Sequence, residues 1–164
     1  TINPSLVIGP GTARDQTSQS FKIVKQLGDG TMKLGTAPYE IGMVDVRDVA
    51  KAHIAAAFVE EAEGRHIVSA ETVSFLQAGQ MLKNHFGNAY PFPAKELPKP
   101  MLWLLGPILD KTFTRKMIGA NMGHSWKANN SKSQEALGLA YSPISEALTQ
   151  MFQQLSDKGA VRPA

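Results

Sequence analysis

Apolar runs closed by turn residues alternate with segments of helical periodicity over the first part of the chain. The apolar residues 6–8 end at the glycine–proline turn of residues 9–11, a pattern typical of a buried parallel strand. Behind Ser18, which can cap a helix, apolar side chains recur at helical spacing up to the turn at residues 28–30. This segment predicts a helix whose buried face contains Phe21, Val24 and Leu27.

The next segment predicts a loop followed by a narrow helix. Residues 31–43 contain two glycines and a proline, so we expect a loop with one short strand. A helix is expected from about residue 46 to residue 59, with Asp45 as its N-cap and Asp48 in its first turn, where the helix dipole favours a carboxylate. We interpret both aspartates as helix-capping residues. Several alanines make this helix thin enough to pack closely on a sheet.

A second strand and helix follow. Residues 66–69 predict a short strand, and Thr72 or Ser74 is expected to cap the next helix, which Gly87 ends. The buried face of that helix is expected to comprise Phe75, Gly79, Leu82 and Phe86. The strand and helix patterns together predict an α/β fold with few short strands.

Four prolines in residues 88–100 predict an irregular segment between two parts of the chain. We expect residues 1–87 to form an α/β part and residues 88–164 a mostly helical part. In the second part, helices are predicted at about residues 100–109, 112–122, 131–137 and 143–157.

The last of these helices has the clearest pattern. We expect Ser142 to cap it and Pro143 to take its first helical position, because proline is favoured there. Gly159 is expected to stop it. Its predicted buried stripe is Ile144, Leu148, Met151, Phe152 and Leu155.

The composition excludes several classes of function. The 164 residues carry a net charge of +3, and the lysines and arginines are spread along the chain, so no nucleic-acid-binding cluster is expected. The sequence has no cysteine, which excludes disulfides and thiolate metal sites and fits a reducing, cytoplasmic compartment. The most apolar run, residues 101–109, is about half the length needed to span a bilayer.

No self-contained catalytic or metal site is visible. Four histidines are present, and none pairs with another at a metal-ligand spacing. We expect His53 to be a hydrogen-bonded structural residue within its helix and His124 to lie at the surface. The glycine-rich turns at residues 9–12 and 28–31 match neither a dinucleotide-binding nor a phosphate-binding motif.

Four stretches carry a resemblance that covers nearly the whole chain. They are TINPSLVIGP at residues 1–10, VDVRDVAKAH at 44–53, GRHIVS at 64–69, and the segment of residues 130–139. Their order and spacing resemble the extended short-chain dehydrogenase/reductases of the NAD-dependent epimerase/dehydratase superfamily, in particular the dihydroflavonol reductase-like branch. The resemblance implies the carboxyl-terminal portion of a Rossmann-type reductase that uses NAD(P).

The resemblance also implies roles for individual residues. Pro4 and Ser5 match residues that line the nicotinamide end of the cofactor, and Ser18 or Gln19 falls where such enzymes contact the cofactor again. The stretch Gly42, Met43 and Val44 borders the substrate pocket. Gly42 stands where the plant flavonoid enzymes carry a substrate-binding glutamine, which favours a general carbonyl reductase over a flavonoid reductase.

Two motifs of such reductases are missing from the chain. A glycine fingerprint for the pyrophosphate is absent, and no tyrosine is followed by a lysine four residues later. The residues four places after the three tyrosines are Met43, Ala94 and Ser145. We therefore expect the chain alone to be inactive as a reductase and to bind no cofactor tightly.

The implied partners are a small carbonyl substrate and either a missing amino-terminal half or a second copy of the chain. An exposed sheet edge would favour such pairing. Two alternatives stay open: a free-standing binding or assembly module that has lost catalysis, and a membrane-surface protein anchored through the helix that contains Trp103.

Overall fold

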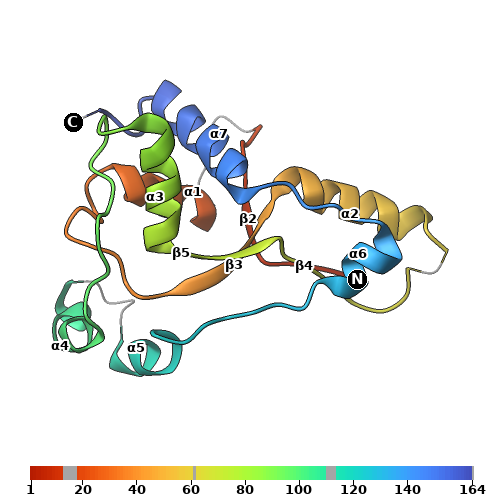
Figure 1. Cartoon of the computed structure of the whole chain (residues 1–164), viewed down its shortest axis with the longest axis horizontal. Helices are drawn as coiled ribbons and strands as arrows, with labels where there is room; N and C mark the ends of the chain where they lie inside the picture. Colours follow the sequence, from red (N-terminus) through yellow and green to blue (C-terminus); the bar gives the residue numbers. More distant parts are fainter. Residues whose placement is uncertain (13–17, 61, 110–113, 164) are drawn as a thin grey trace.

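A computed structural model of the chain describes residues 1–12, 18–60, 62–109 and 114–163 (Figure 1). Over these ranges the α/β fold with few short strands and several helices is confirmed. The strands are β1 Ile2–Pro4, β2 Leu6–Ile8, β3 Glu40–Asp45, β4 His66–Val68 and β5 Glu71–Ser74. The helices are α1 Gln19–Gly28, α2 Val46–Phe58, α3 Phe75–Phe86, α4 Lys99–Leu109, α5 Arg115–Asn121, α6 Ser131–Leu137 and α7 Ile144–Asp157.

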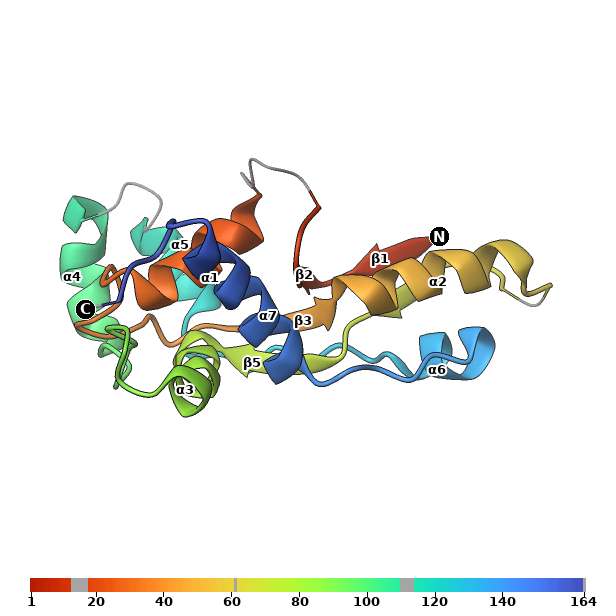
Figure 2. The ribbon, with the colours of Figure 1, turned by 90° about the horizontal axis from the view of Figure 1, so that it is seen from above.

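The strands form two small sheets, and the continuous segment of residues 2–8 contributes one strand to each of them. β1 pairs in parallel with β4, and β2 pairs in parallel with β3, which is antiparallel to β5. Only Ser5 separates β1 from β2, and its N–H donates to the carbonyl oxygen of Val68 at 3.0 Å. The chain turns a corner at this point (Figure 2). Ser5 therefore lies where the chain passes from one sheet to the other.

The larger core is formed by α1, α3 and α7 over the sheet β2–β3–β5. The apolar stripe predicted for α7 is buried, with Phe152 fully inaccessible at its centre. Phe152 meets the rings of Phe86, Tyr90 and Phe92 at centroid distances between 4.9 and 5.3 Å. Such tilted and edge-to-face pairs suit the charge distribution of aromatic rings. The helix α7, near the carboxyl end of the chain, thus completes a core that is formed mainly by earlier elements (Figure 1).

A smaller core lies between the sheet β1–β4 and the helices α2 and α6. Its buried members are Val44, Ala52, Val68, Leu137 and Leu139. The alanine-rich side of α2 lies here, as its thin profile predicted. The opposite side of α2 carries apolar side chains into solvent: Ile54 is 62% and Phe58 86% exposed.

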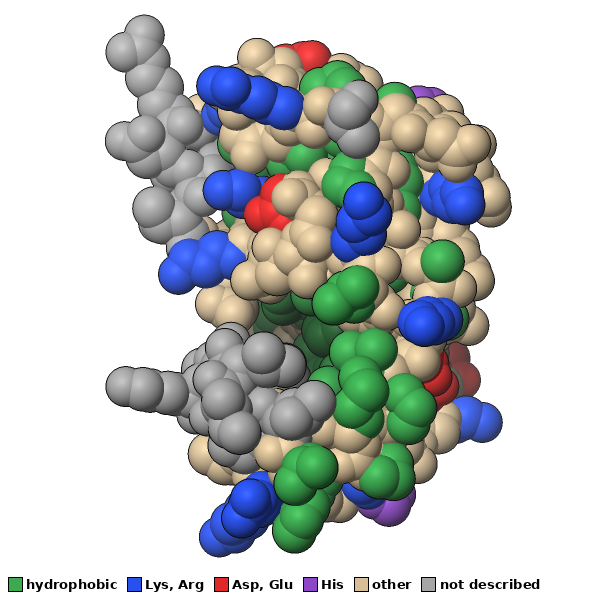
Figure 3. Space-filling view, turned by 90° about the vertical axis from the view of Figure 1, so that its left-hand side faces the viewer, with side chains coloured by type: hydrophobic (Ala, Val, Ile, Leu, Met, Phe, Trp, Pro, Cys, Tyr) green, Lys and Arg blue, Asp and Glu red, His purple; other side chains and the backbone are tan. Residues whose placement is uncertain are grey.

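The helices α4 and α5 pack on each other around Leu102, Ile118 and Met122. Arg115 lies over the ring of Trp103, 4.7 Å from its centroid. Met101, Trp103 and Leu104 of α4 are exposed. Hydrophobic side chains gather over the lower part of the face in Figure 3. Among the described residues, no helix combines the length and apolarity that spanning a membrane requires.

The start of α7 corrects one prediction. Ser142 does not cap the helix; Pro143 is the N-cap residue and makes no side-chain cap bond. The N–H and hydroxyl of Ser142 instead donate to Asp48, at 2.7 and 3.2 Å. Asp48 does lie in the first turn of α2, but its carboxylate serves this distant segment and Lys51, so its interpretation as a capping residue was wrong.

Other helix starts agree in part with the predictions. Asp45 caps α2, since its carboxylate accepts from the N–H of Arg47 at 2.8 Å. Ser74, not Thr72, caps α3 through a reciprocal capping box with Gln77, and Thr72 belongs to the unpredicted strand β5. The predicted helix 112–122 is observed as α5, while residues 112 and 113 lie outside the described ranges.

Candidate functional site

Ser5 carries a hydroxyl group that no described residue satisfies. Its main-chain N–H is bonded to Val68, but its Oγ is buried and without a hydrogen-bond partner. A buried hydroxyl without a partner is unfavourable by about 1–3 kcal/mol, so such groups usually serve a ligand or water. The corner between the two sheets thus offers one free polar group.

Gly42 lies beside this corner on β3 and is covered by an aromatic ring. β2 and β3 pair with Leu6 opposite Met43, which brings Gly42 next to the Ser5 corner. A Cβ atom added to Gly42 would lie 2.2 Å from Cζ3 of Trp126 and 2.6 Å from Oγ of Ser69. Glycine is therefore required at position 42 as long as Trp126 holds this place.

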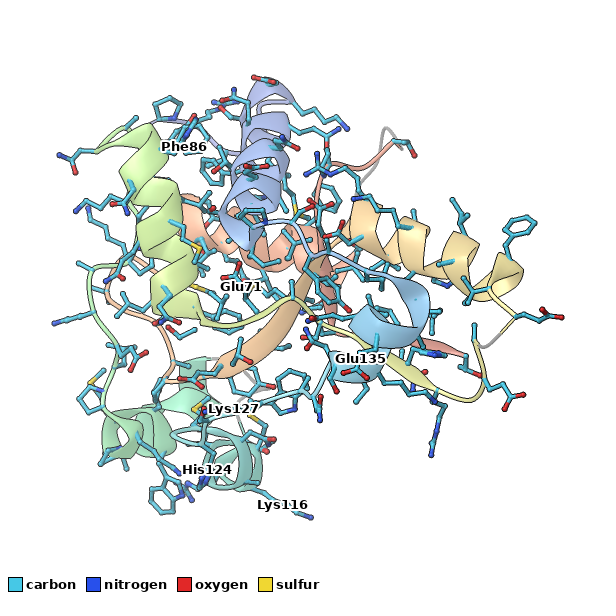
Figure 4. All side chains as sticks on the ribbon, turned by 45° about the vertical axis from the view of Figure 1, so that its right-hand side comes forward. Glu71, Phe86, Lys116, His124, Lys127 and Glu135 are labelled. Carbon is cyan, nitrogen blue, oxygen red and sulfur yellow. The ribbon has the colours of Figure 1, made fainter. Side chains whose placement is uncertain are left out.

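Trp126 sits on an extended segment, residues 123–130, which we call the strap. Its beginning is fixed by the N–H of Gly123, which donates to the carbonyl oxygen of Pro38 at 2.9 Å. Its end is fixed by the side-chain amide of Asn130, which donates to the carbonyl oxygen of Ser69 at 2.7 Å. Figure 4 shows the strap leaving α5, with His124 and Lys127 labelled on it. Both anchors place Trp126 over β3.

The strap and the corner enclose a hollow of about 280 Å³. Its walls are made by Ser5, Leu6, Tyr39, Glu40, Ile41 and Trp126. The ring of Tyr39 packs against the ring of Phe75, with 5.7 Å between the two ring centroids. The hollow joins a free hydroxyl, apolar walls and one carboxylate, a combination common in small-molecule sites.

The structure brings together only some of the residues predicted for the site. Ser5 lines the hollow and Gly42 lies under its aromatic wall. Pro4, at the end of β1, is exposed. The side chains of Met43 and Val44 alternate across the strand into the larger and the smaller core. These two residues therefore shape the site through the backbone of β3.

The two residues predicted for a second cofactor contact lie elsewhere. Ser18 is the N-cap residue of α1 but makes no side-chain cap bond, and its hydroxyl meets that of Ser20 at 3.1 Å. Gln19 begins the helix, and both residues are exposed. Neither lines the hollow beside Ser5. Their role toward a cofactor stays a prediction.

Two titratable groups on the strands have shifted pKa values. Burial raises the pKa of Asp45, but hydrogen bonds from the side chain and main chain of Arg47 outweigh it, so this pKa is lowered. His66 is fully buried and, among the described residues, neither of its ring nitrogens has a hydrogen-bond partner. Burial lowers the pKa of His66, and the positive charge of Lys132 lowers it further. The fold therefore favours the neutral form of His66.

The other histidines agree with their predicted places. Nδ1 of His53 lies 2.8 Å from the carbonyl oxygen of Val49 within α2, a local structural bond. His124 is exposed on the strap. In the parts of the chain that the structure describes, no three histidine or acidic side chains gather as a metal site would require.

Sequence reasoning missed Trp126 as a site residue, and also the other lining residues Leu6, Tyr39, Glu40 and Ile41. Trp126 stands in a polar segment of glycine, histidine, serine and asparagine, without the periodicity that marks a buried face. An isolated tryptophan in such a segment was the available signal, because large aromatic side chains seldom lie in polar loops without a contact.

Comparison with known proteins gives a consistent result. No family model matches the chain. Cinnamoyl-CoA reductase 1 of Petunia hybrida is 28% identical over 160 residues, which are 96% of this chain and 40% of that protein. The chain thus spans less than half the length of this relative.

Solved structures show the same relation. The protein gox2253 has a TM-score of 0.72 at 20% identity, over 98% of this chain and 50% of that one. Gre2 from Candida albicans, crystallised with NADPH, has a TM-score of 0.65 at 25% identity, over 96% of this chain and 43% of that one. The likeness covers this chain almost completely and the other proteins only in part.

Proposed function

We propose that this chain, which has the fold of the carboxyl-terminal part of an extended short-chain dehydrogenase/reductase, forms the substrate side of an NAD(P)-dependent carbonyl reductase. The observation that carries the proposal is the hollow between Ser5, Tyr39 and Trp126. The hollow is lined by Ser5, a residue for which the resemblance implies a place at the nicotinamide, and Gly42, for which it implies a place at the substrate, lies under its aromatic wall.

Ser5 fits a place beside the nicotinamide. Its buried Oγ has no partner among the described residues and is available to an amide or a similar polar group. Bound NAD(P)H would supply the hydride for reduction of the carbonyl carbon. The residues of this chain would hold the substrate and keep water out, while the proton donor would come from another part of the protein.

Reduction of an aldehyde or ketone is the reaction that we propose for the whole protein. A relative is named cinnamoyl-CoA reductase, and a structural relative was crystallised with NADPH. Residues 1–87 would contribute the cofactor-side wall and residues 88–164 the cover over the substrate. The strap, which comes from the second part and lies over β3 of the first, supports this division.

Apolar side chains exposed on the surface favour a further protein segment as the partner of this chain. Ile54 and Phe58, on the side of α2 that faces away from the smaller core, and Ile67 of β4 expose apolar side chains. Among the described strands, β1 has β4 as its partner. An amino-terminal Rossmann half would cover these groups and extend the sheet. The sequence contains no cysteine, which fits the reducing cytoplasm as the place of action.

The test compares two proteins: the complete reading frame that contains this chain, and residues 1–164 alone. Each is incubated with NADPH or NADH and a series of aldehydes and ketones, and the loss of absorbance of the reduced cofactor is followed. We expect turnover only with the complete reading frame. Turnover by residues 1–164 alone would show that the chemistry lies within them. No turnover by either protein would favour the free-standing binding module.

A further inference from the structure

Trp126 occupies the space that a side chain at position 42 would take. The indole atoms Cζ3 and Cη2 lie 2.2 and 2.7 Å from the place of a Cβ on Gly42, well inside van der Waals contact. A residue larger than glycine and the ring of Trp126 therefore exclude each other. Gly42 and Trp126, which are far apart in the sequence, are thus complementary in shape: the ring occupies the space that glycine leaves free.

The indole is also part of the wall of the hollow. Trp126 is 43% exposed, so one part of the ring rests on β3 while another stays accessible. The strap anchors at Gly123 and Asn130 hold the segment on either side of it. A fixed, accessible aromatic face binds flat or apolar groups well, because little conformational freedom is lost.

The remaining wall selects against negative charge. Leu6, Tyr39 and Ile41 add apolar surface, and Glu40 is the charged residue of the lining. Among the described residues no cation forms an ion pair with Glu40. A substrate with a carboxylate or phosphate in this hollow would meet an uncompensated like charge.

We propose that Trp126 is a specificity-determining residue, which selects uncharged aldehydes or ketones that carry an aromatic or branched apolar group. This inference rests on the proposed reductase function and adds the substrate class to it. The ring of Trp126 binds the apolar group of the substrate, and Gly42 gives the ring its place. Glu40 disfavours anionic carbonyl compounds.

The experiment uses the complete reading frame and three probes: 3-phenylpropanal, propanal and glyoxylate. We expect Trp126→Ala to lower kcat/KM for 3-phenylpropanal by about tenfold or more, and for propanal by less than about threefold. Trp126→Phe retains a ring and should recover most of the loss. Glu40→Gln should raise the ratio of kcat/KM for glyoxylate to kcat/KM for propanal.

A double-mutant cycle tests the pair itself. Gly42→Ala should displace the ring and lower kcat/KM for 3-phenylpropanal as Trp126→Ala does. Combined with Trp126→Ala in a Ser69→Ala background, it should add little further loss, because both close contacts of the added Cβ are then gone. Circular dichroism of each variant confirms that it is folded.

The outcomes separate this inference from the proposed function. A wild-type protein that reduces aldehydes, with Trp126→Ala and Trp126→Phe affecting all three probes equally, overturns the inference and leaves the reductase function intact. Full additivity of Gly42→Ala and Trp126→Ala in the Ser69→Ala background also overturns it. A wild-type protein without turnover removes the proposed function and this inference with it.

Discussion

The carboxylate of Asp48 accepts two hydrogen bonds from Ser142, one from its N–H at 2.7 Å and one from its hydroxyl at 3.2 Å, across 94 positions of sequence. Two residues further, the N–H of Ile144 donates to Glu71 at 3.2 Å. Figure 4 labels Glu71, on β5, below α7. Carboxylates from α2 and β5 thus hold the beginning of α7, where a helix dipole favours negative charge.

Replacing Asp48 should weaken the whole fold. In Asp48→Ala the main-chain N–H of Ser142 loses its partner in a partly buried place, and we expect the free energy of unfolding to fall by about 2–3 kcal/mol. Urea denaturation followed by circular dichroism measures this. Glu135→Ala, at an exposed position of α6, is the control and should change stability by less than about 0.5 kcal/mol. Equal effects of both substitutions would contradict the assignment.

The close contact between α1 and α7 predicts that Gly28 tolerates no side chain. A Cβ at Gly28 would lie 2.4 Å from the ring of Phe152, which is fully buried. Gly28→Ala should therefore lower the free energy of unfolding by about 1–3 kcal/mol, as overpacked cores do. Gly119→Ala is the matched control, because nothing lies within 4 Å of its added Cβ on α5. Alanine favours helices over glycine, so this control should be neutral or stabilising.

Buried His66 predicts a loss of stability in acid. Its pKa is lowered in the fold, so the unfolded chain binds the proton more tightly. The stabilising effect of the neutral ring is fully present above its unfolded pKa of about 6.5, and it is lost as the pH falls below that value. The melting temperature, measured between about pH 8 and about pH 5, should fall less in His66→Leu than in the wild type. His53→Gln, at the exposed histidine of α2, should retain the wild-type profile.

The free hydroxyl of Ser5 predicts an effect on the cofactor rather than on the fold. Ser5→Ala in the complete reading frame should weaken NADPH binding by about threefold to tenfold, the size of one hydrogen bond, without lowering the free energy of unfolding. Fluorescence titration with NADPH measures the affinity. Thr36→Val removes a similar buried, unpartnered hydroxyl away from the hollow and is the control. Equal affinities of wild type and Ser5→Ala would remove Ser5 from the cofactor site.

Regular periodicity made most of the helices predictable. The stripe of α7 and the thin side of α2 follow directly from the spacing of apolar residues, and Asp45 marked the start of α2 correctly. The prediction for Ser142 was wrong because a serine before a proline is a common local helix start. Here the N–H and the hydroxyl of Ser142 instead donate to the carboxylate of Asp48 on another element. Strand β5 was missed because its four residues run directly into α3, with Ser74 both ending the strand and capping the helix, and show no alternation of their own.

From the sequence, only the side of the site formed by the Ser5 corner and β3 was predictable, and the side formed by the strap was not. Ser5 and Gly42 lie in motifs with a recognisable order along the chain, and the structure brings them together through the pairing of β2 with β3. Trp126 comes from an irregular segment whose path depends on hydrogen bonds to Pro38 and Ser69. No local pattern encodes such a path, because its partners are distant in sequence.

The pairing of β1 with β4 also determines when the fold can form. Ile2 meets His66, and Leu6 meets Met43, so both parallel pairings must close long stretches of chain before they contribute stability. During synthesis the first strands leave the ribosome well before their partners, and the larger core stays open until α7 has followed. The slowest step of folding should therefore be the arrival of Phe152 among the rings of Phe86, Tyr90 and Phe92. Until then, the apolar strands stay exposed, and such surfaces favour aggregation.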